Sequence, residues 1–179
     1  MVSLKFDFIF DEIGVFNETT LLNSTCIWII HANKIPPHLG LSVNGKFFSL
    51  KVKGKDENVD YKQLINIISN KQIGTFIISL KSTLSLPDIE NYFTNLTEIN
   101  EIKPSCLTPI NELILPESKV EKISALLEKL KVKGEIASVF SLYLDKDFRG
   151  IRYYSEREIQ ERIKELAHVE RKKHLPPSR

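Results

Sequence analysis

Residues 31–50 read HANKIPPHLGLSVNGKFFSL, and this stretch decides much of the predicted fold. Two apolar runs flank Asn44 and Gly45, a dipeptide typical of two-residue β-hairpins because both turn positions need a positive φ. The Pro-Pro pair before the first run breaks the chain, since proline has no N–H group to donate. The stretch therefore predicts two antiparallel strands, with His38 at the mouth of the first.

The spacing of apolar residues predicts both strands and helices outside this hairpin. Alternation or dense β-branched composition predicts strands over 4–10, 25–32, 73–81 and 135–144. Helical spacing and capping residues predict helices over 60–71, 84–96, 106–114, 118–131 and 153–173. The stretch GKDENV, residues 54–59, has neither pattern and is predicted to be a loop.

Three helix starts carry side chains that favour capping. Asp60 is the predicted N-cap of the first of these helices. Ser118 with Glu121, and Ser155 with Glu158, have the spacing of a capping box, in which each residue satisfies a backbone N–H of the other. These signals fix where we expect the helices to begin.

Together the elements predict an α+β fold with two parts. Residues 1–116 are predicted to form a small antiparallel sheet packed with helices, and residues 117–179 a helix-rich C-terminal extension. Pro116 marks the predicted boundary between them, because proline disfavours continuation of a preceding helix. The chain length suits one sizeable domain with an appendage.

Composition narrows the classes of function. The formal charge of +2 over 179 residues argues against a nucleic-acid partner. The N-terminus lacks the pattern of a signal peptide, and no apolar run is long enough for a membrane span, so we expect a cytoplasmic protein. The two cysteines, four histidines and their spacings contain no metal-ligand motif, so no metal site is predicted.

Cys106 is the candidate nucleophile. It precedes a short apolar run at helical spacing, and Pro109 falls in the first turn, where its missing N–H costs nothing. The start of a helix favours a thiolate and supplies N–H groups for an oxyanion. His38 is the candidate base. The alternatives are that His38 is an ordinary loop histidine and that Cys106, like Cys26 in its apolar strand, belongs to the core.

The order of these residues resembles that of circularly permuted papain-like proteins, over roughly residues 20–115. That group includes lecithin–retinol-acyltransferase-like proteins and permuted NlpC-type amidases. In it, a histidine leads a strand, a glycine-containing turn and a second strand follow, and the nucleophilic cysteine comes much later at the start of a helix. HLGLSV, Asn44-Gly45, KFFSL and Cys106 follow the same order here.

The resemblance implies a permuted papain-like fold for the core and a cysteine-dependent amidase or acyltransferase that needs no cofactor. Catalytic members of that group usually carry a third polar residue near the end of the second hairpin strand, where Ser49 is the nearest match in this chain. The cysteine is often preceded by asparagine in that group, whereas Ser105 precedes it here. The other reading is an inactive papain-like scaffold that binds a protein partner through residues 117–179. The partner is therefore an amide or acyl substrate, or another protein.

Overall fold

A computed structural model describes residues 5–51, 54–96, 105–155, 157–159, 161, 162 and 164. Its helices are α1 (Glu18–Asn23), α2 (Tyr61–Lys71), α3 (Leu86–Asn95), α4 (Leu107–Ile114) and α5 (Ile123–Val132). Its strands are β1 (Phe6–Ile9), β2 (Thr25–Ile30), β3 (His38–Val43), β4 (Lys46–Leu50), β5 (Lys55–Asp60), β6 (Thr75–Leu80), β7 (Ile136–Leu142) and β8 (Gly150–Arg152).

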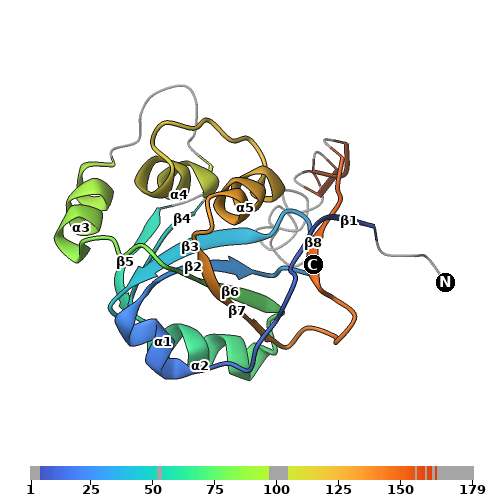
Figure 1. The fold of residues 1–179 in the computed structure, drawn as a ribbon, viewed down its shortest axis with the longest axis horizontal. Helices are drawn as coiled ribbons and strands as arrows, with labels where there is room; N and C mark the ends of the chain where they lie inside the picture. The colour runs from blue at the N-terminus through green and yellow to red at the C-terminus, as the bar shows by residue number, and fades with distance from the viewer. Residues whose placement is uncertain are drawn as a thin grey trace, which may run out of the picture.

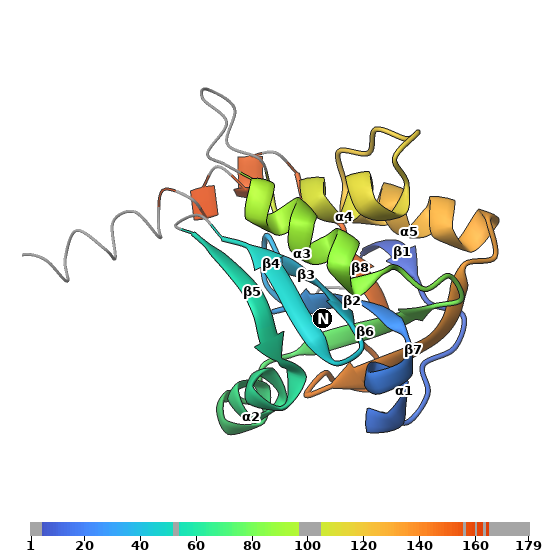
Figure 2. The same cartoon turned by 90° about the vertical axis from the view of Figure 1, so that its left-hand side faces the viewer.

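A six-stranded sheet in the order β5-β4-β3-β2-β6-β7 organises the molecule. Every neighbouring pair in it is antiparallel. Helices α1 and α2 lie on one face, and α3, α4 and α5 lie on the other (Figures 1 and 2). The α+β class is therefore confirmed, and the sheet is larger than the small one predicted, because strands β5 and β7 extend it at its two edges.

The two faces of the sheet bury separate clusters of apolar side chains. Strand β2 shows why, since all six of its residues are buried and successive side chains point to opposite faces. Ile27 and Ile29 pack with the cluster under α3, α4 and α5. Trp28 and Ile30 pack with the cluster under α1 and α2. A nearly continuous apolar strand is what a sheet covered on both faces requires.

Strand β5 corrects the predicted loop over 54–59. It pairs with β4, and next to this pairing the Lys51 N–H donates to the Gly54 carbonyl at 2.9 Å. Gly54 has a φ of +93°, which favours glycine. The strand is missed from sequence because it is a polar edge strand, whose stability comes from pairing with β4 and not from an apolar pattern.

The helix predicted over 118–131 begins later, at Ile123. Its predicted capping box does not form, because Ser118 is held in the turn after α4. The Ser118 N–H donates to the Leu115 carbonyl at 2.8 Å, and the Ser118 carbonyl accepts the Asn111 side-chain amide at 2.5 Å. Lys122 is the N-cap, with extended backbone and no side-chain cap bond.

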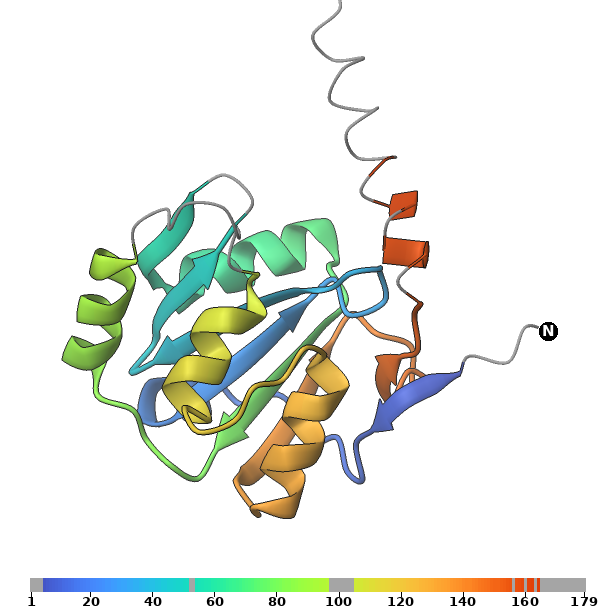
Figure 3. The same ribbon diagram turned by 90° about the horizontal axis from the view of Figure 1, so that it is seen from above.

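Residues after Pro116 also contribute strands. The segment predicted as a strand over 135–144 is β7, which pairs with β6 at the edge of the sheet. Strand β8 pairs with β1 in a separate two-stranded sheet beside the main one (Figure 3). The strand predicted over 4–10 is thus confirmed as β1. The division of the chain at residue 116 stays a prediction.

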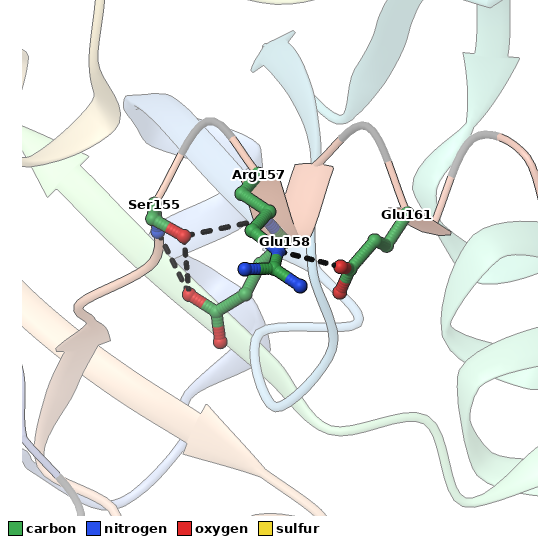
Figure 4. Close-up of polar contacts among 4 residues, drawn as sticks. All are labelled: Ser155, Arg157, Glu158 and Glu161. Atoms are coloured by element: carbon green, nitrogen blue, oxygen red, sulfur yellow. Dashed lines mark hydrogen bonds and ion pairs between the residues drawn. The ribbon is translucent and has the colours of Figure 1, made fainter.

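The second predicted capping box does form. The Ser155 N–H donates to Glu158 Oε2 at 2.8 Å, and the Glu158 N–H donates to Ser155 Oγ at 3.3 Å (Figure 4). Arg157 and Glu161 form an ion pair one turn apart at 2.8 Å. The remainder of the helix predicted over 153–173, and with it the helix-rich character of the extension, lies largely outside the described residues.

None of the helices in the described ranges is both long enough and apolar enough to cross a membrane.

Candidate functional site

The β3–β4 hairpin forms as predicted and opens at its far end. Asn44 and Gly45 have φ values of 49° and 74°. The ladder runs from the Val43–Lys46 pair to the Leu41–Phe48 pair. In a two-residue hairpin the backbone groups of alternate residues point at the partner strand, so those of Leu39 point toward β4. Leu39 lies beyond the last pair of the ladder, which leaves its N–H for another acceptor.

The thiol of Cys106 lies near this N–H group. Cys106 is the N-cap of α4, which packs against β3, and the backbone N–H groups of Leu39 and Cys106 favour its thiolate. Burial raises the pKa of the thiol above its ordinary value, and the two N–H groups act in the opposite direction. The resting thiol is therefore protonated near neutral pH. The predicted helix with Pro109 in its first turn is confirmed, and it packs against β3, the strand that begins at His38.

His38 is the first residue of β3, and its side chain leaves the strand on the face covered by α2. It stands opposite Ile30, which belongs to the cluster on that face. The pKa of His38 is lowered, mainly by burial. The charge of Asp56 raises this pKa, whereas the charges of Lys51 and His31 lower it further. The imidazole is thus neutral near pH 7. Its Nε2 atom is buried and has no hydrogen-bond partner among the described residues.

Ser49, the predicted third polar residue, contacts a carboxylate. It is 2% exposed and stands opposite Asp56 on β5. The Ser49 hydroxyl donates to Asp56 Oδ2 at 2.7 Å. Lys51 Nζ contacts Asp56 Oδ1 at 2.5 Å. Ser49 and His38 share a face of the sheet, because Ser49 alternates with Phe47 on β4 and His38 stands opposite Ile30, and both Phe47 and Ile30 belong to the cluster under α1 and α2.

Gly40 is required where it stands. A Cβ atom there would lie 2.2 Å from Cε2 of the Phe47 ring and 3.2 Å from the Phe48 carbonyl oxygen. The ring of Phe47 therefore fills the space beside the strand that carries His38. This packing holds β3 and β4 at a fixed separation just before the sheet opens.

The structure joins some of the predicted site residues and leaves others apart. It joins Ser49 to Asp56 by a hydrogen bond, and it packs α4, the helix that Cys106 caps, against β3. It gives His38 Nε2 no bond to the thiol. Cys26 is fully buried in β2, and burial raises the pKa of its thiol to about 12, as expected of a core cysteine. Both cysteines are free.

Two residues near the site are missed from sequence. Asp56 is missed because β5 is predicted as a loop. The only sequence signal for Asp56 is its position shortly after the hairpin. Tyr154 follows β8; burial raises the pKa of its phenol, and the nearby Asp7 and Cys106 add to the rise. Nothing in the local pattern around Tyr154 links it to Cys106, since the proximity comes from tertiary packing.

A separate cavity lies away from these residues. It has a volume of about 490 Å³ and lies between the segment after β1 and strand β7. Asp11 and Lys131, which form an ion pair at 2.7 Å, are part of its lining. Across the described ranges, no group of three or more histidine, cysteine or acidic side chains is arranged to hold a metal ion.

Comparison with known proteins adds no relative to this picture. No family model, no curated protein and no solved structure matches the chain. Function is therefore inferred from the geometry of the opened hairpin and of the helix α4 that packs against it.

Proposed function

We propose that the protein is a cysteine-dependent amidase or acyltransferase of permuted papain-like type, in which Cys106 is the nucleophile and His38 the base. One observation carries the proposal: helix α4, which Cys106 caps, packs against β3, the strand that begins at His38. A cysteine at a helix start and a histidine at a strand start, far apart in sequence, thus lie on neighbouring elements, with the His38 side chain directed to the α2 face and Cys106 on the other face. The role requires that His38, as the first residue of β3, turn its side chain toward Cys106 when substrate binds, because Nε2 has no hydrogen-bond partner among the described residues.

In the proposed reaction, neutral His38 takes the proton of the Cys106 thiol as the sulfur attacks a carbonyl carbon. The carbonyl electron pair moves to oxygen, and backbone N–H groups at the start of α4 stabilise that oxyanion. The C–N or C–O bond to the leaving group then breaks, and the leaving group takes the proton from the imidazolium. Water or an acceptor attacks the resulting thioester and frees the thiol. These steps need no cofactor.

The second candidate function is an inactive scaffold that binds a protein partner. Two observations favour it: strand alternation directs His38 to the α2 face, and burial raises the pKa of the Cys106 thiol. Exposed apolar residues after Pro116 would supply a docking surface, including Val132 at 80% exposure and Tyr153 at 41%. In this reading Cys106 is a structural thiol that completes the packing at the opened hairpin.

The pH dependence of alkylation by iodoacetamide separates the two functions. If His38 is the base, the rate at Cys106 rises with pH as His38 loses its proton, at a pH below the ordinary histidine pKa of 6.5. In His38→Gln the thiol must ionise alone, so the rise moves above the ordinary thiol pKa of 9.0. Peptide mapping measures the alkylation of each cysteine separately, and the buried Cys26 is the internal control.

An inert Cys106 in the folded chain, or the same pH profile with and without His38, would favour the scaffold. A cytoplasmic location stays a prediction under either function.

A further inference from the structure

The segment that follows β1 meets the outer edge of β7 at one point and then leaves it. The Gly14 N–H donates to the Val139 carbonyl at 2.8 Å, where a single isolated bridge joins the two chains. Earlier in the same segment, the Phe10 N–H donates to the Arg149 carbonyl at 2.9 Å and not to β7. The cavity of about 490 Å³ lies in this opening, and the first four residues of β7 form one of its walls.

This wall presents backbone groups that have no partner. The Val139 carbonyl points away from β6, because it accepts the Gly14 N–H, and in a strand the N–H of the same residue points the same way. The Glu135 carbonyl accepts the Lys81 N–H at 2.8 Å, so the Ile136 N–H, across the same trans peptide group, also points away from β6. Neither N–H donates to a described residue. A strand edge with unpaired backbone groups is a template for another extended chain.

The charged side chains around the cavity leave one cation and one anion without an ion-pair partner. Lys131 Nζ contacts Asp11 Oδ1 at 2.7 Å, so these two charges offset each other. Lys81 and Glu12 also line the cavity, and neither forms an ion pair within the described ranges. Lys81 Nζ lies at the turn between α5 and β7, 3.9 Å from where a Cβ atom on Gly134 would stand. Glu12 belongs to the segment that faces β7, so the two charges lie on different walls.

We propose that this cavity binds a short peptide in extended form along the outer edge of β7, with its carboxylate end at Lys81 and its amino end toward Glu12. Carbonyl groups of the peptide accept the N–H groups of Ile136 and Val139. The four β7 residues of the wall span ~13 Å at ~3.3 Å per residue, so the peptide has about three residues. The inference does not depend on the proposed function, because the cavity contains none of the residues assigned to it.

The other side chains of the cavity suit such a ligand. Phe8, Phe10 and Ile136 line it and supply an apolar surface for one side chain of the peptide. Ala137 is exposed on the β7 wall, and its small side chain lets another backbone approach the edge. The volume falls within the ~300–1,000 Å³ of pockets that hold small ligands. Because backbone hydrogen bonds supply the affinity in strand addition, we expect tolerance of peptide sequence.

The test is an NMR titration of the full chain with the tripeptide alanyl-leucyl-alanine. The backbone N–H resonances of Ile136 and Val139 are expected to shift as the peptide binds. Lys81→Met is expected to raise the Kd about fivefold, the effect of one exposed ion pair. Lys133→Met is the matched control and should leave the Kd unchanged, because Lys133, like Lys81, lies near Glu135 but does not line the cavity.

The same tripeptide with an amidated C-terminus tests the contact at Lys81. Loss of the carboxylate should weaken binding to the native chain by about the same factor and should cause no further loss in Lys81→Met. Ala137→Phe places a ring against the edge of β7 and is expected to abolish binding, while circular dichroism checks that the variant is folded.

Two results would overturn the inference. The first is no shift at Ile136 and Val139 with up to about 10 mM tripeptide, a concentration that detects even weak binding. The second is that octanoate, a carboxylate without peptide groups, binds as tightly as the tripeptide and leaves both N–H resonances in place. In that case the cavity is a site for an organic anion, and the edge of β7 pairs with no peptide.

Discussion

Replacement of Cys106 by alanine is expected to lower the rate of acyl transfer from an activated ester, such as p-nitrophenyl acetate, by about 10³-fold or more. The sulfur is the atom that forms the thioester, so no neighbouring group can replace it. The Ser49 hydroxyl is already committed to Asp56 at 2.7 Å. The measurement is the release of p-nitrophenol near neutral pH, with the uncatalysed rate subtracted.

Cys26→Ala is the matched control for this experiment, because Cys26 is a fully buried thiol of β2. This variant also loses one thiol group. We expect it to leave the rate of ester cleavage unchanged and to lower the free energy of unfolding slightly. A Cys106→Ala protein that is folded and keeps the native rate would show that ester cleavage does not pass through this thiol. Loss of activity in both variants would indicate a general effect of altered packing.

Replacement of Trp28 by alanine is expected to lower the free energy of unfolding by about 3–5 kcal/mol. Trp28 is fully buried in β2, its ring lies 5.8 Å from that of Phe47 at an interplanar angle of 78°, and its Nε1–H donates to Ser42 Oγ at 2.8 Å. The change leaves a cavity under α1 and α2 and an unpaired hydroxyl. Since a domain is stable by about 5–15 kcal/mol, much of that stability is lost.

Urea denaturation followed by circular dichroism measures this effect, because the variant lacks the only tryptophan of the chain. Trp28→Phe keeps an aromatic ring but loses the donor to Ser42, so we expect a smaller loss than in Trp28→Ala. A cost below about 1 kcal/mol for Trp28→Ala would contradict the account of a closely packed second core, since truncation of a buried aromatic side chain normally costs more.

The hairpin illustrates what local chemistry predicts well. Asn44 and Gly45 favour one turn type, and the turn fixes the register of β3 and β4. The apolar strands β2 and β6 and the N-cap Asp60 are equally local signals. Asp60 accepts the Lys62 N–H at 2.9 Å, as the sequence predicts.

Strand β5 and the start of α5 show where local chemistry is insufficient. A polar edge strand forms because its backbone groups pair with β4, and KDENVD shows no alternation that would reveal it. Ser118 has the spacing of a capping residue, but tertiary contacts with α4 hold it in a turn. In both cases pairing or packing with a neighbouring element overrides the local preference.

In the candidate site, too, some features follow from local sequence and others depend on tertiary packing. The helix start at Cys106 and the strand start at His38 follow from sequence, because proline and turn residues mark them. The packing of α4 against β3 is a tertiary contact that no local pattern encodes. Asp56 is missed for the same reason as its strand.

The most direct test of the central claim is to look for the thioester itself. The native chain is exposed briefly to p-nitrophenyl acetate, quenched in acid and digested, and its peptides are examined by mass spectrometry. We predict an acetyl group on Cys106 that neutral hydroxylamine removes and that His38→Gln acquires more slowly. An unmodified Cys106, with ester cleavage continuing and acetyl groups found only on lysines, would contradict the assignment of this thiol as the nucleophile.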